Sequence, residues 1–306
     1  MAVMILAERG KLSVNDPICK YIESCPKTWA GITVRHLLNH TSGIPDFTGF
    51  PDNDHYERLP MMPLETIARF RDKPLEFVPG ERFRYDSSGY LLLGYIIERA
   101  SGERYEDFLR ENIYEPLGMR DSGYDHPWII LKNRASGYER KDGQVVNAMI
   151  MEMDTPFGGG SMYSTVGDLL RWDQALYSEK LVSRESLKQI FTPYQGPYPP
   201  VQPWERGWYA RHRYGYGWSI TKWFTRDLVW HGGIIHGFCS AILRYPQDHT
   251  LVVVLENMEP NLEGTVDPDL DMDPMTTANG VSAIAFGLPS NTIPVSIKNP
   301  DTTGKK

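Results

Sequence analysis

The sequence predicts an α+β fold in which an antiparallel sheet packs against helices, with a helical subdomain. Helix signals fill about residues 1–192, whereas about residues 213–290 read as strands separated by turns and then a last helix. Helices followed by an antiparallel sheet are typical of α+β domains. The chain has 306 residues, of which 41% are hydrophobic, so it can bury a sizeable core. We expect one domain over residues 1–306, with a loop at about 193–212 and a tail at 291–306.

The first element is the end of a buried helix. Apolar residues fill MAVMIL, and Glu8, Arg9 and Gly10 follow them. A glycine is a common C-terminal end for a helix, but no Ser, Thr, Asp or Asn caps the beginning of this one. We therefore expect a helix that frays at its start or that continues from a segment outside this sequence.

Further helices are predicted from apolar faces and capping residues. Tyr90–Ile97 is apolar on nearly every side, which indicates a buried helix that ends before Gly102. The segment YEDFLRENIY is expected to form a second helix that stops at Pro116. Other helices follow the caps Thr33, Ser164 or Thr165, and Ser183, and they cover VRHLL, VGDLLRWDQAL and RESLKQIF.

Turns and strands complete the expected fold. NHTSGIPDF is a loop of turn-forming residues, and Asp142-Gly143 marks a β-hairpin. The C-terminal strands are expected in YGYGWSI, LVWHGG, FCSAILRYP and TLVVVLEN, with a last helix near GVSAIAFG.

A segment rich in Pro, Tyr and Trp precedes these strands and has no clear period. A loop this long in a compact domain is often functional, although a packed surface excursion is equally consistent with the sequence. As a functional loop it would line the mouth of a cleft with apolar walls for an acyl group. The candidate aromatic residues are Tyr194, Tyr198, Trp204, Trp208 and Tyr209.

Composition excludes several classes of function. The net charge of −7 and the pI near 5.7 argue against a nucleic-acid partner, because such affinity comes largely from clustered positive charge. Cys19, Cys25 and Cys239 are too few for a disulfide framework and lack metal-ligand spacing. The apolar start is too short to span a membrane and lacks the features of a signal peptide. We expect the chain as given to be cytoplasmic and leave the export of a longer form open.

A series of segments resembles one family in the family's own order. The series is ILAERGKLSVNDP, HLLNHTSGIPDF, VPGERFRYDSSGYLLLGYIIERASG, IYEPLGM, GGGSMYSTVGDLLRW, YGYGWSI, WHGGIIHGF and LRYPQDHTLVVVLEN. Together they resemble the serine β-lactamases and penicillin-binding-protein-like hydrolases, in the branch of class C β-lactamases, esterases and D-alanyl-D-alanine carboxypeptidases. The resemblance implies a β-lactamase-like fold over nearly the whole chain.

That family surrounds the reacting carbonyl with three elements: Ser-x-x-Lys, Tyr-x-Asn, and Lys-Thr-Gly or His-x-Gly. Tyr85-Asp86-Ser87 stands at the second position and His231-Gly232-Gly233 at the third. The first element is expected just upstream of Met1 on the same helix, together with the family's opening strands. Their absence would leave an unpaired sheet edge, and with it a tendency to self-associate.

The resemblance also implies roles for individual residues. Tyr85 would relay a proton between the serine and the leaving group, which requires a phenol pKa lowered by neighbouring cations. Ser87 replaces the family's Asn, which puts recognition of an amide-bearing substrate in doubt. Taken alone, without the resemblance, Tyr85 would be read as a packed aromatic ahead of a helix cap.

The third element has its own expected chemistry. Gly232 and Gly233 would let a substrate approach the backbone, and the amide of Ile234 would be one oxyanion donor. His231 in place of lysine favours esters or peptides over the carboxylate of a β-lactam. Without these glycines, His231 would be read as an ordinary half-buried histidine of a strand.

Other motif-like strings are expected to be accidental. Ser24–Lys27 contains Pro26, and Ser219 and Lys222 should point to opposite faces of a strand, so neither Ser-x-x-Lys string suits a nucleophile. GGGSMYS lacks the second glycine of a nucleophile elbow. His231 and His236 should face opposite ways, and the acidic run DPDLDMDP lacks the glycine and glutamate of a calcium loop. We expect no metal and no cofactor.

The sequence therefore predicts a serine hydrolase that acts on an ester, amide or lactam through an acyl-enzyme, with the nucleophile absent from this chain. The expected partner is a small-molecule or peptide substrate, without nucleic acid or a membrane span. The alternative is a catalytically silent homologue that binds a peptide or ester-like ligand or serves as a scaffold.

Overall fold

The computed structural model describes residues 1–198, 213–259 and 274–289. The chain divides into two compact units. Among the described residues, the first comprises residues 1–130, 151–198 and 213–220, and the second comprises residues 131–150, 221–259 and 274–289. The expectation of a single domain stays a prediction.

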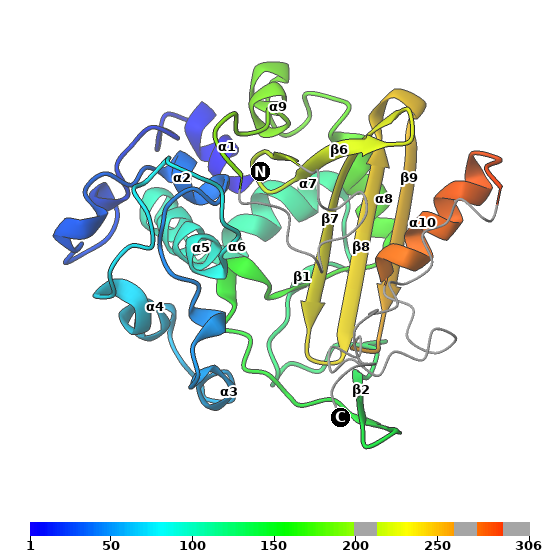
Figure 1. Cartoon of the computed structure of the whole chain (residues 1–306), viewed down its shortest axis with the longest axis horizontal. Helices are drawn as coiled ribbons and strands as arrows, with labels where there is room; N and C mark the ends of the chain where they lie inside the picture. Colours follow the sequence, from blue (N-terminus) through cyan, green and yellow to red (C-terminus); the bar gives the residue numbers. More distant parts are fainter. Residues whose placement is uncertain (199–212, 260–273, 290–306) are drawn as a thin grey trace, which may run out of the picture. The chain divides into compact units, whose positions relative to one another are not determined.

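Helix α5 (Ser87–Ser101) is the centre of the first unit, where it contacts α1, α2, α4 and α6 (Figure 1). Its residues Leu91–Ile97 are all buried, as the apolar sequence predicts, and Gly102 ends the helix at φ 81°. The other helices of this unit are α1 (Ala2–Glu8), α2 (Val34–Leu38), α3 (Asn53–Tyr56), α4 (Pro63–Arg71), α6 (Tyr105–Leu109), α7 (Glu115–Leu117), α8 (Val166–Ala175) and α9 (Arg184–Ile190).

A glycine lets α5 approach a short helical turn very closely. A side chain at Gly94 would place its Cβ 2.7 Å from the ring of Phe157, and a Cβ at Gly158 would lie 2.5 Å from the carbonyl oxygen of Tyr90. Phe157 and Gly158 belong to the turn η5 (Phe157–Gly159). The GGGS segment therefore serves helix packing, and Ser161 after it is fully buried and donates to the carbonyl of Met153.

Most of the predicted helix ends are confirmed. Thr33 forms a capping box with α2, Thr165 accepts from the amide of Asp168 at 3.2 Å, and Ser183 accepts from the amide of Ser186 at 3.3 Å. The expected stop at Pro116 is wrong. Helix α6 continues through a π turn (Arg110–Tyr114) into α7, and Gly118 ends that helix at φ 69°. The wider π turn directly before Pro116, in which the Glu115 amide donates to the carbonyl of Arg110, interrupts the regular α-helical hydrogen bonds at the point where the proline offers no amide.

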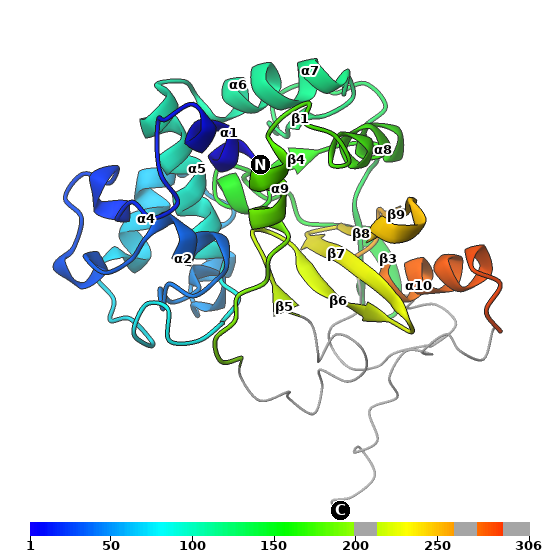
Figure 2. The same cartoon turned by 90° about the horizontal axis from the view of Figure 1, so that it is seen from above.

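The main sheet is an antiparallel meander with the strand order β5-β6-β7-β8-β9. Its register pairs His231 with Ile242 and Ala241 with Val254. In the second unit, α10 (Pro274–Ala285) contacts β8 and β9, and Figure 2 shows it beside them. The strands are β5 (Arg213–Tyr214), β6 (Ser219–Trp223), β7 (Arg226–Ile235), β8 (Phe238–Tyr245) and β9 (Thr250–Glu256).

Two small antiparallel pairs accompany this sheet. One is β1 (Gly123–Tyr124) with β4 (Met162–Tyr163) in the first unit, and the other is β2 (Tyr138–Lys141) with β3 (Gln144–Asn147) in the second. The β2–β3 turn is Asp142-Gly143, at φ 50° and 76°, which confirms the predicted hairpin.

The single strand expected in YGYGWSI is wrong. The chain turns between β5 and β6, where Gly217 has φ 78° and the amide of Gly215 donates to the carbonyl of Trp218 at 2.8 Å. The alternating aromatic residues of YGYGWSI are typical of a strand, but Gly217 at positive φ allows the chain to reverse direction there.

The cysteines also differ from expectation, since Cys19 and Cys25 form a disulfide. This bond closes a short local loop rather than a framework, and Cys239 is free and buried on β8. Within the described residues, no helix has the length and apolar character needed to cross a membrane.

Candidate active site

The candidate tyrosine precedes α5 on a segment that the helix cap holds in place. Asp86 is the N-cap, with extended backbone, and its carboxylate Oδ1 accepts from the amide of Gly89 at 2.6 Å. An N-cap of this kind satisfies one of the free amides of the first turn. Tyr85 is thereby fixed one residue outside the helix, and 49% of its surface is exposed.

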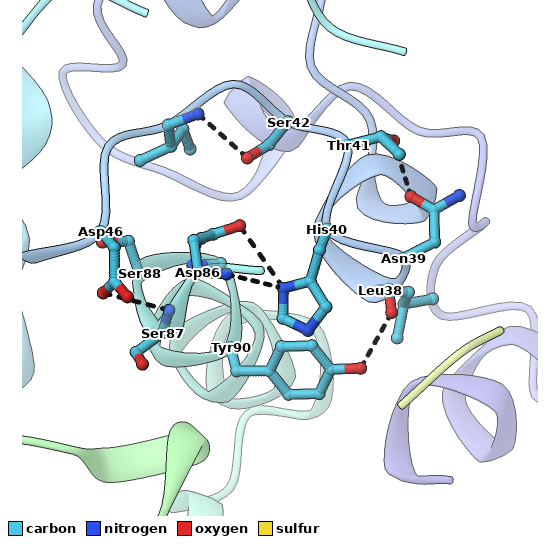
Figure 3. Close-up of polar contacts among 12 residues, drawn as sticks. Leu38, Asn39, His40, Thr41, Ser42, Asp46, Asp86, Ser87, Ser88 and Tyr90 are labelled. Carbon is cyan, nitrogen blue, oxygen red and sulfur yellow. Dashed lines mark hydrogen bonds and ion pairs between the residues drawn. The ribbon is translucent and has the colours of Figure 1, made fainter. Parts of the chain in front are cut away.

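A buried histidine contacts the backbone of this segment. The amide of Asp86 donates to His40 Nδ1 at 3.2 Å (Figure 3). Asp86 Oδ2 lies 3.4 Å from the same nitrogen, so the imidazole contacts both the backbone amide and the carboxylate of the cap residue. His40 is only 1% exposed, and among the described residues its Nε2 has no hydrogen-bond partner.

Aromatic rings surround His40. The centroid of its ring lies 4.2 Å from that of Tyr85, 4.8 Å from that of Tyr214 and 4.9 Å from that of Tyr90. The Tyr90 hydroxyl donates to the carbonyl of Leu38 at 2.9 Å, beside the start of the His40 loop (Figure 3). Tyr85 is thus the exposed member of a cluster in which His40 and Tyr214 are buried and Tyr90 is half-buried.

The electrostatics of Tyr85 differ from the expected catalytic state. Its pKa is raised to about 12, first by desolvation of the phenolate and then by the negative charges of Asp46 and Asp86. The phenol is therefore protonated near pH 7 and can donate a hydrogen bond. To act as a base it would need the additional positive charge that the family places nearby.

The start of α5 is joined to residues 45–47 by hydrogen bonds between side chains and backbone groups. The amide of Ser87 donates to Asp46 Oδ1 at 3.2 Å, and the Ser88 hydroxyl donates to the carbonyl of Pro45 at 2.8 Å. The amide of Phe47 donates back to Ser88 Oγ at 3.0 Å. Ser87 is half-buried at the first position of α5, beside Tyr85, where the resemblance places it.

The second candidate element lies on β7 in the other unit. His231 is half-buried, and its Nδ1 lies 2.6 Å from the carbonyl of Gly232. Gly233 and Ile234 are exposed, so a substrate can reach their backbone. A Cβ at Gly233 would lie 2.8 Å from Ser240 Oγ, a hydroxyl that can rotate away. This local arrangement suits an oxyanion donor from the Ile234 amide.

The described part of the aromatic loop is packed. Tyr198 stacks on Phe83 with ring centroids 4.9 Å apart, and the Tyr194 hydroxyl donates to the carbonyl of Gly80 at 2.6 Å. These contacts favour the packing alternative for both tyrosines. Trp204, Trp208 and Tyr209 lie outside the described residues, so their expected role stays a prediction.

Neither Ser-x-x-Lys string forms a catalytic pair. Ser24 and Lys27 are exposed in a turn beside the Cys19–Cys25 disulfide. Ser219 is buried on β6, whereas Lys222 is exposed and pairs with Asp227 Oδ1 at 2.5 Å. Both observations agree with the interpretation that these strings are accidental.

The sequence predicts only a loop of turn-forming residues at NHTSGIPDF and assigns no site role to His40. Its contacts with Asp86 and Tyr85 join residues more than 40 positions apart, and no local pattern encodes them.

Comparison with known proteins agrees with this geometry. The Beta-lactamase family model matches residues 1–273. "Penicillin-binding protein 4*" of Bacillus subtilis is 28% identical over 278 residues, covering 86% of this chain and 59% of that protein. The chain spans about half the length of the curated relatives it matches.

Solved structures show the same fold. The octameric penicillin-binding protein homologue from Pyrococcus abyssi is 32% identical with a TM-score of 0.76, covering 95% of this chain and 64% of that one. A D-stereospecific amidohydrolase from Streptomyces is 22% identical with a TM-score of 0.73, covering 84% of this chain and 78% of that one. At that identity the second likeness concerns the fold alone.

Proposed function

The chain belongs to the β-lactamase family of serine hydrolases, and from this premise we propose that it carries two of the three elements of an acyl-transfer site. The proposed reaction is cleavage of an ester, amide or lactam through an acyl-enzyme. One observation carries the proposal: Tyr85 presents an exposed phenol from a buried, hydrogen-bonded support of His40 and Asp86.

In the proposed reaction a serine Oγ attacks the carbonyl carbon while its proton passes to a base. The leaving group then departs with a proton, and water later hydrolyses the acyl-enzyme. We assign proton relay to Tyr85 and oxyanion stabilisation to the Ile234 amide. Because neither Ser-x-x-Lys string in the chain fits, the proposal assigns the nucleophile to a Ser-x-x-Lys element outside residues 1–306.

The proposed substrate is a small ester or peptide. His231 carries a less permanent positive charge than the lysine that many relatives use, so a substrate carboxylate would be held less strongly. Ser87 offers a hydroxyl where the family has an amide, which removes one donor to a substrate amide carbonyl. The first difference favours an ester or peptide over a β-lactam, and the second favours an ester over a substrate that carries an amide.

The alternative proposal is a silent homologue that binds such a ligand without reacting. The raised pKa of Tyr85 favours it for residues 1–306 alone, because a phenol with a pKa of about 12 is a donor and not a base. Binding would then involve Ser87, Gly232 and Gly233 without covalent chemistry.

Two further features of the whole protein are proposed. The Cys19–Cys25 disulfide supports an oxidising compartment for the mature protein, against the cytoplasmic expectation. Self-association through the β9 edge is consistent with the octameric state named for the Pyrococcus abyssi homologue.

Intact-mass measurement tests the reaction. The 306-residue chain is incubated with an activated ester and with a chromogenic β-lactam, and we expect no covalent adduct. A version extended upstream through Ser-x-x-Lys is expected to give one stoichiometric acyl adduct on that serine, and Tyr85→Phe should slow its formation by about 100-fold or more. An adduct on Ser24, Ser219 or another serine of residues 1–306 would relocate the site, whereas ligand binding by an extended chain that never acylates would support the silent alternative.

A further inference from the structure

Three metal-ligating side chains converge in the second unit, on segments that the acyl-transfer proposal does not use. Glu139, His236 and Glu259 are each half-buried, and their ligand atoms all lie within 4.8 Å of one another. His236 Nδ1 lies 3.5 Å from Glu259 Oε2. The sequence predicts no metal because these residues are about 100 and 20 positions apart and share no motif.

The backbone places the two carboxylates side by side. Tyr138 forms a parallel bridge with Met258: its amide donates to the carbonyl of Asn257 at 3.1 Å, and the amide of Glu259 donates to the carbonyl of Tyr138 at 2.9 Å. Glu139 and Glu259 each follow this bridged pair by one residue. Residues at matching positions of paired strands point to the same side, so the fold forces these two like charges together.

The turn between β7 and β8 brings the histidine to the same place. His236 precedes Gly237, which has φ 78°, and a Cβ at Gly237 would lie 2.6 Å from the Cβ of Ala148 and 2.7 Å from the Cα of Gly137. The two backbones therefore touch through Gly137 and Gly237. The Gly237 amide also donates to Glu259 Oε2 at 3.4 Å. His236 is thus held by rigid backbone contacts and not by its side chain alone.

We propose that Glu139, His236 and Glu259 bind one divalent transition-metal ion, with Zn²⁺ preferred. Two adjacent carboxylates repel each other, and a bound cation removes that cost. Zn²⁺ accepts imidazole nitrogen and carboxylate oxygen at about 2.1 Å, which gives a ligand-to-ligand separation of about 3.4 Å in a tetrahedral site. The 3.5 Å between Nδ1 and Oε2 already matches that separation.

Such an ion would join three segments of the second unit: β2, the β7–β8 turn and the chain that follows β9. Its role is structural, since a ligand that binds only the folded state stabilises it. Without a metal ion, a protonated His236 could offset the charge of the two carboxylates by itself. The two arrangements are distinguished by metal binding, because only the first takes up one ion per chain.

Metal titration of the chelator-treated, untagged 306-residue chain tests this inference. Isothermal calorimetry with Zn²⁺ is expected to give one binding site per chain. Mn²⁺ should bind more weakly than Zn²⁺, because imidazole ligands favour Zn²⁺, and Ca²⁺ should not compete with Zn²⁺ for the site. At a Zn²⁺ concentration 100-fold above the measured Kd, the melting temperature should rise by about 5 °C. The visible spectrum of the Co²⁺ form reports the coordination without any variant.

Matched variants locate the site. Glu139→Gln, Glu259→Gln and His236→Asn should each weaken Zn²⁺ binding by roughly tenfold or more. His249→Asn is the control, because His249 is an exposed histidine in a different turn of the same unit. Its affinity for Zn²⁺ should equal that of the parent chain.

Each outcome decides the inference. Absence of Zn²⁺ binding to the folded parent chain, or binding that survives both Glu→Gln substitutions and His236→Asn, overturns it and leaves the imidazolium pairing. A variant that loses cooperative unfolding is not interpreted. The other two ligand variants and the Co²⁺ spectrum of the parent chain then decide whether the three residues bind the ion. Acylation does not enter these measurements, so failure here is independent of the acyl-transfer proposal.

Discussion

His40 shows how one buried polar side chain can hold a candidate site residue in place. Its Nδ1 accepts from the amide of Asp86, and its ring contacts those of Tyr85, Tyr90 and Tyr214. The backbone at His40 has φ 55°, a conformation that asparagine tolerates well. The imidazole therefore connects the HTSG loop, the α5 cap and the tyrosine in a single contact set.

We expect His40→Asn to lower the free energy of unfolding by about 2–4 kcal/mol, because it removes a buried ring and leaves the Asp86 amide without its acceptor. Urea unfolding followed by tryptophan fluorescence measures the loss. His249→Asn is the matched control, since His249 is exposed with φ 47°, and its effect should stay within about 0.5 kcal/mol. Equal effects of the two substitutions would contradict the role assigned to His40.

The raised pKa of Tyr85 predicts a pH dependence. The folded state holds the phenolic proton more tightly than the unfolded state, whose tyrosine titrates near pH 10, so the contribution of Tyr85 to stability is complete below pH 10 and is lost as the pH rises toward about 12. Unfolding measured at intervals from pH 8 to the highest pH at which the chain folds should show a smaller alkaline loss for Tyr85→Phe than for the parent. Parallel curves would show that Tyr85 titrates normally.

At the scale of elements, packing of α5 depends on one glycine. Gly94→Ala would bring a methyl group to 2.7 Å from the Phe157 ring and 3.1 Å from the Cα of Gly158, so backbone would have to move. We expect a loss of about 1–3 kcal/mol in unfolding free energy, as overpacking usually causes.

Gly167→Ala is the control for this substitution. Gly167 is exposed in α8, and a Cβ there would meet no atom closer than 3.8 Å. Alanine is the better helix former, so stability should be unchanged or higher by up to about 1 kcal/mol. If both alanine variants gained stability, the close approach of α5 to η5 would not exist in solution.

The sequence predicts those elements whose signals are local. Thr33, Thr165 and Ser183 cap their helices as expected, and Asp142-Gly143 forms its hairpin, because each depends on residues within a few positions. The turn between β5 and β6 was missed because its aromatic residues imitate a strand. The contacts of His40 and the meeting of Glu139 with Glu259 depend on distant chain segments, for which a single sequence holds no periodic signal.

At the scale of the whole molecule, the two candidate elements lie in different compact units. Tyr85 belongs to the first unit and His231 to the second. Each unit has its own support for its element: the α5 cap for Tyr85, and the β7–β8 ladder for the backbone around Gly232. Family membership is what connects the two elements into one proposed site.

The end strand of the sheet leads to the last prediction. In the strand order, β9 pairs with β8 and ends the described sheet, and Leu255 on it is 43% exposed. An end strand with apolar side chains offers free backbone groups to another molecule. We therefore expect the 306-residue chain to self-associate and to bind a hydrophobic dye, with a mass above that of the monomer by light scattering after size exclusion.

Leu255→Lys should shift the chain toward the monomer, because a charged residue on an end strand opposes edge-to-edge pairing. Ile284→Lys is the comparison, since Ile284 is exposed on α10, which is a helix and offers no strand edge, and it should leave the mass unchanged if pairing occurs through β9. The reverse result would move the contact to α10. A compact monomeric parent with sharp cooperative unfolding and no dye uptake would refute the edge contact altogether, because a chain with an exposed pairing edge should show at least one of these signs.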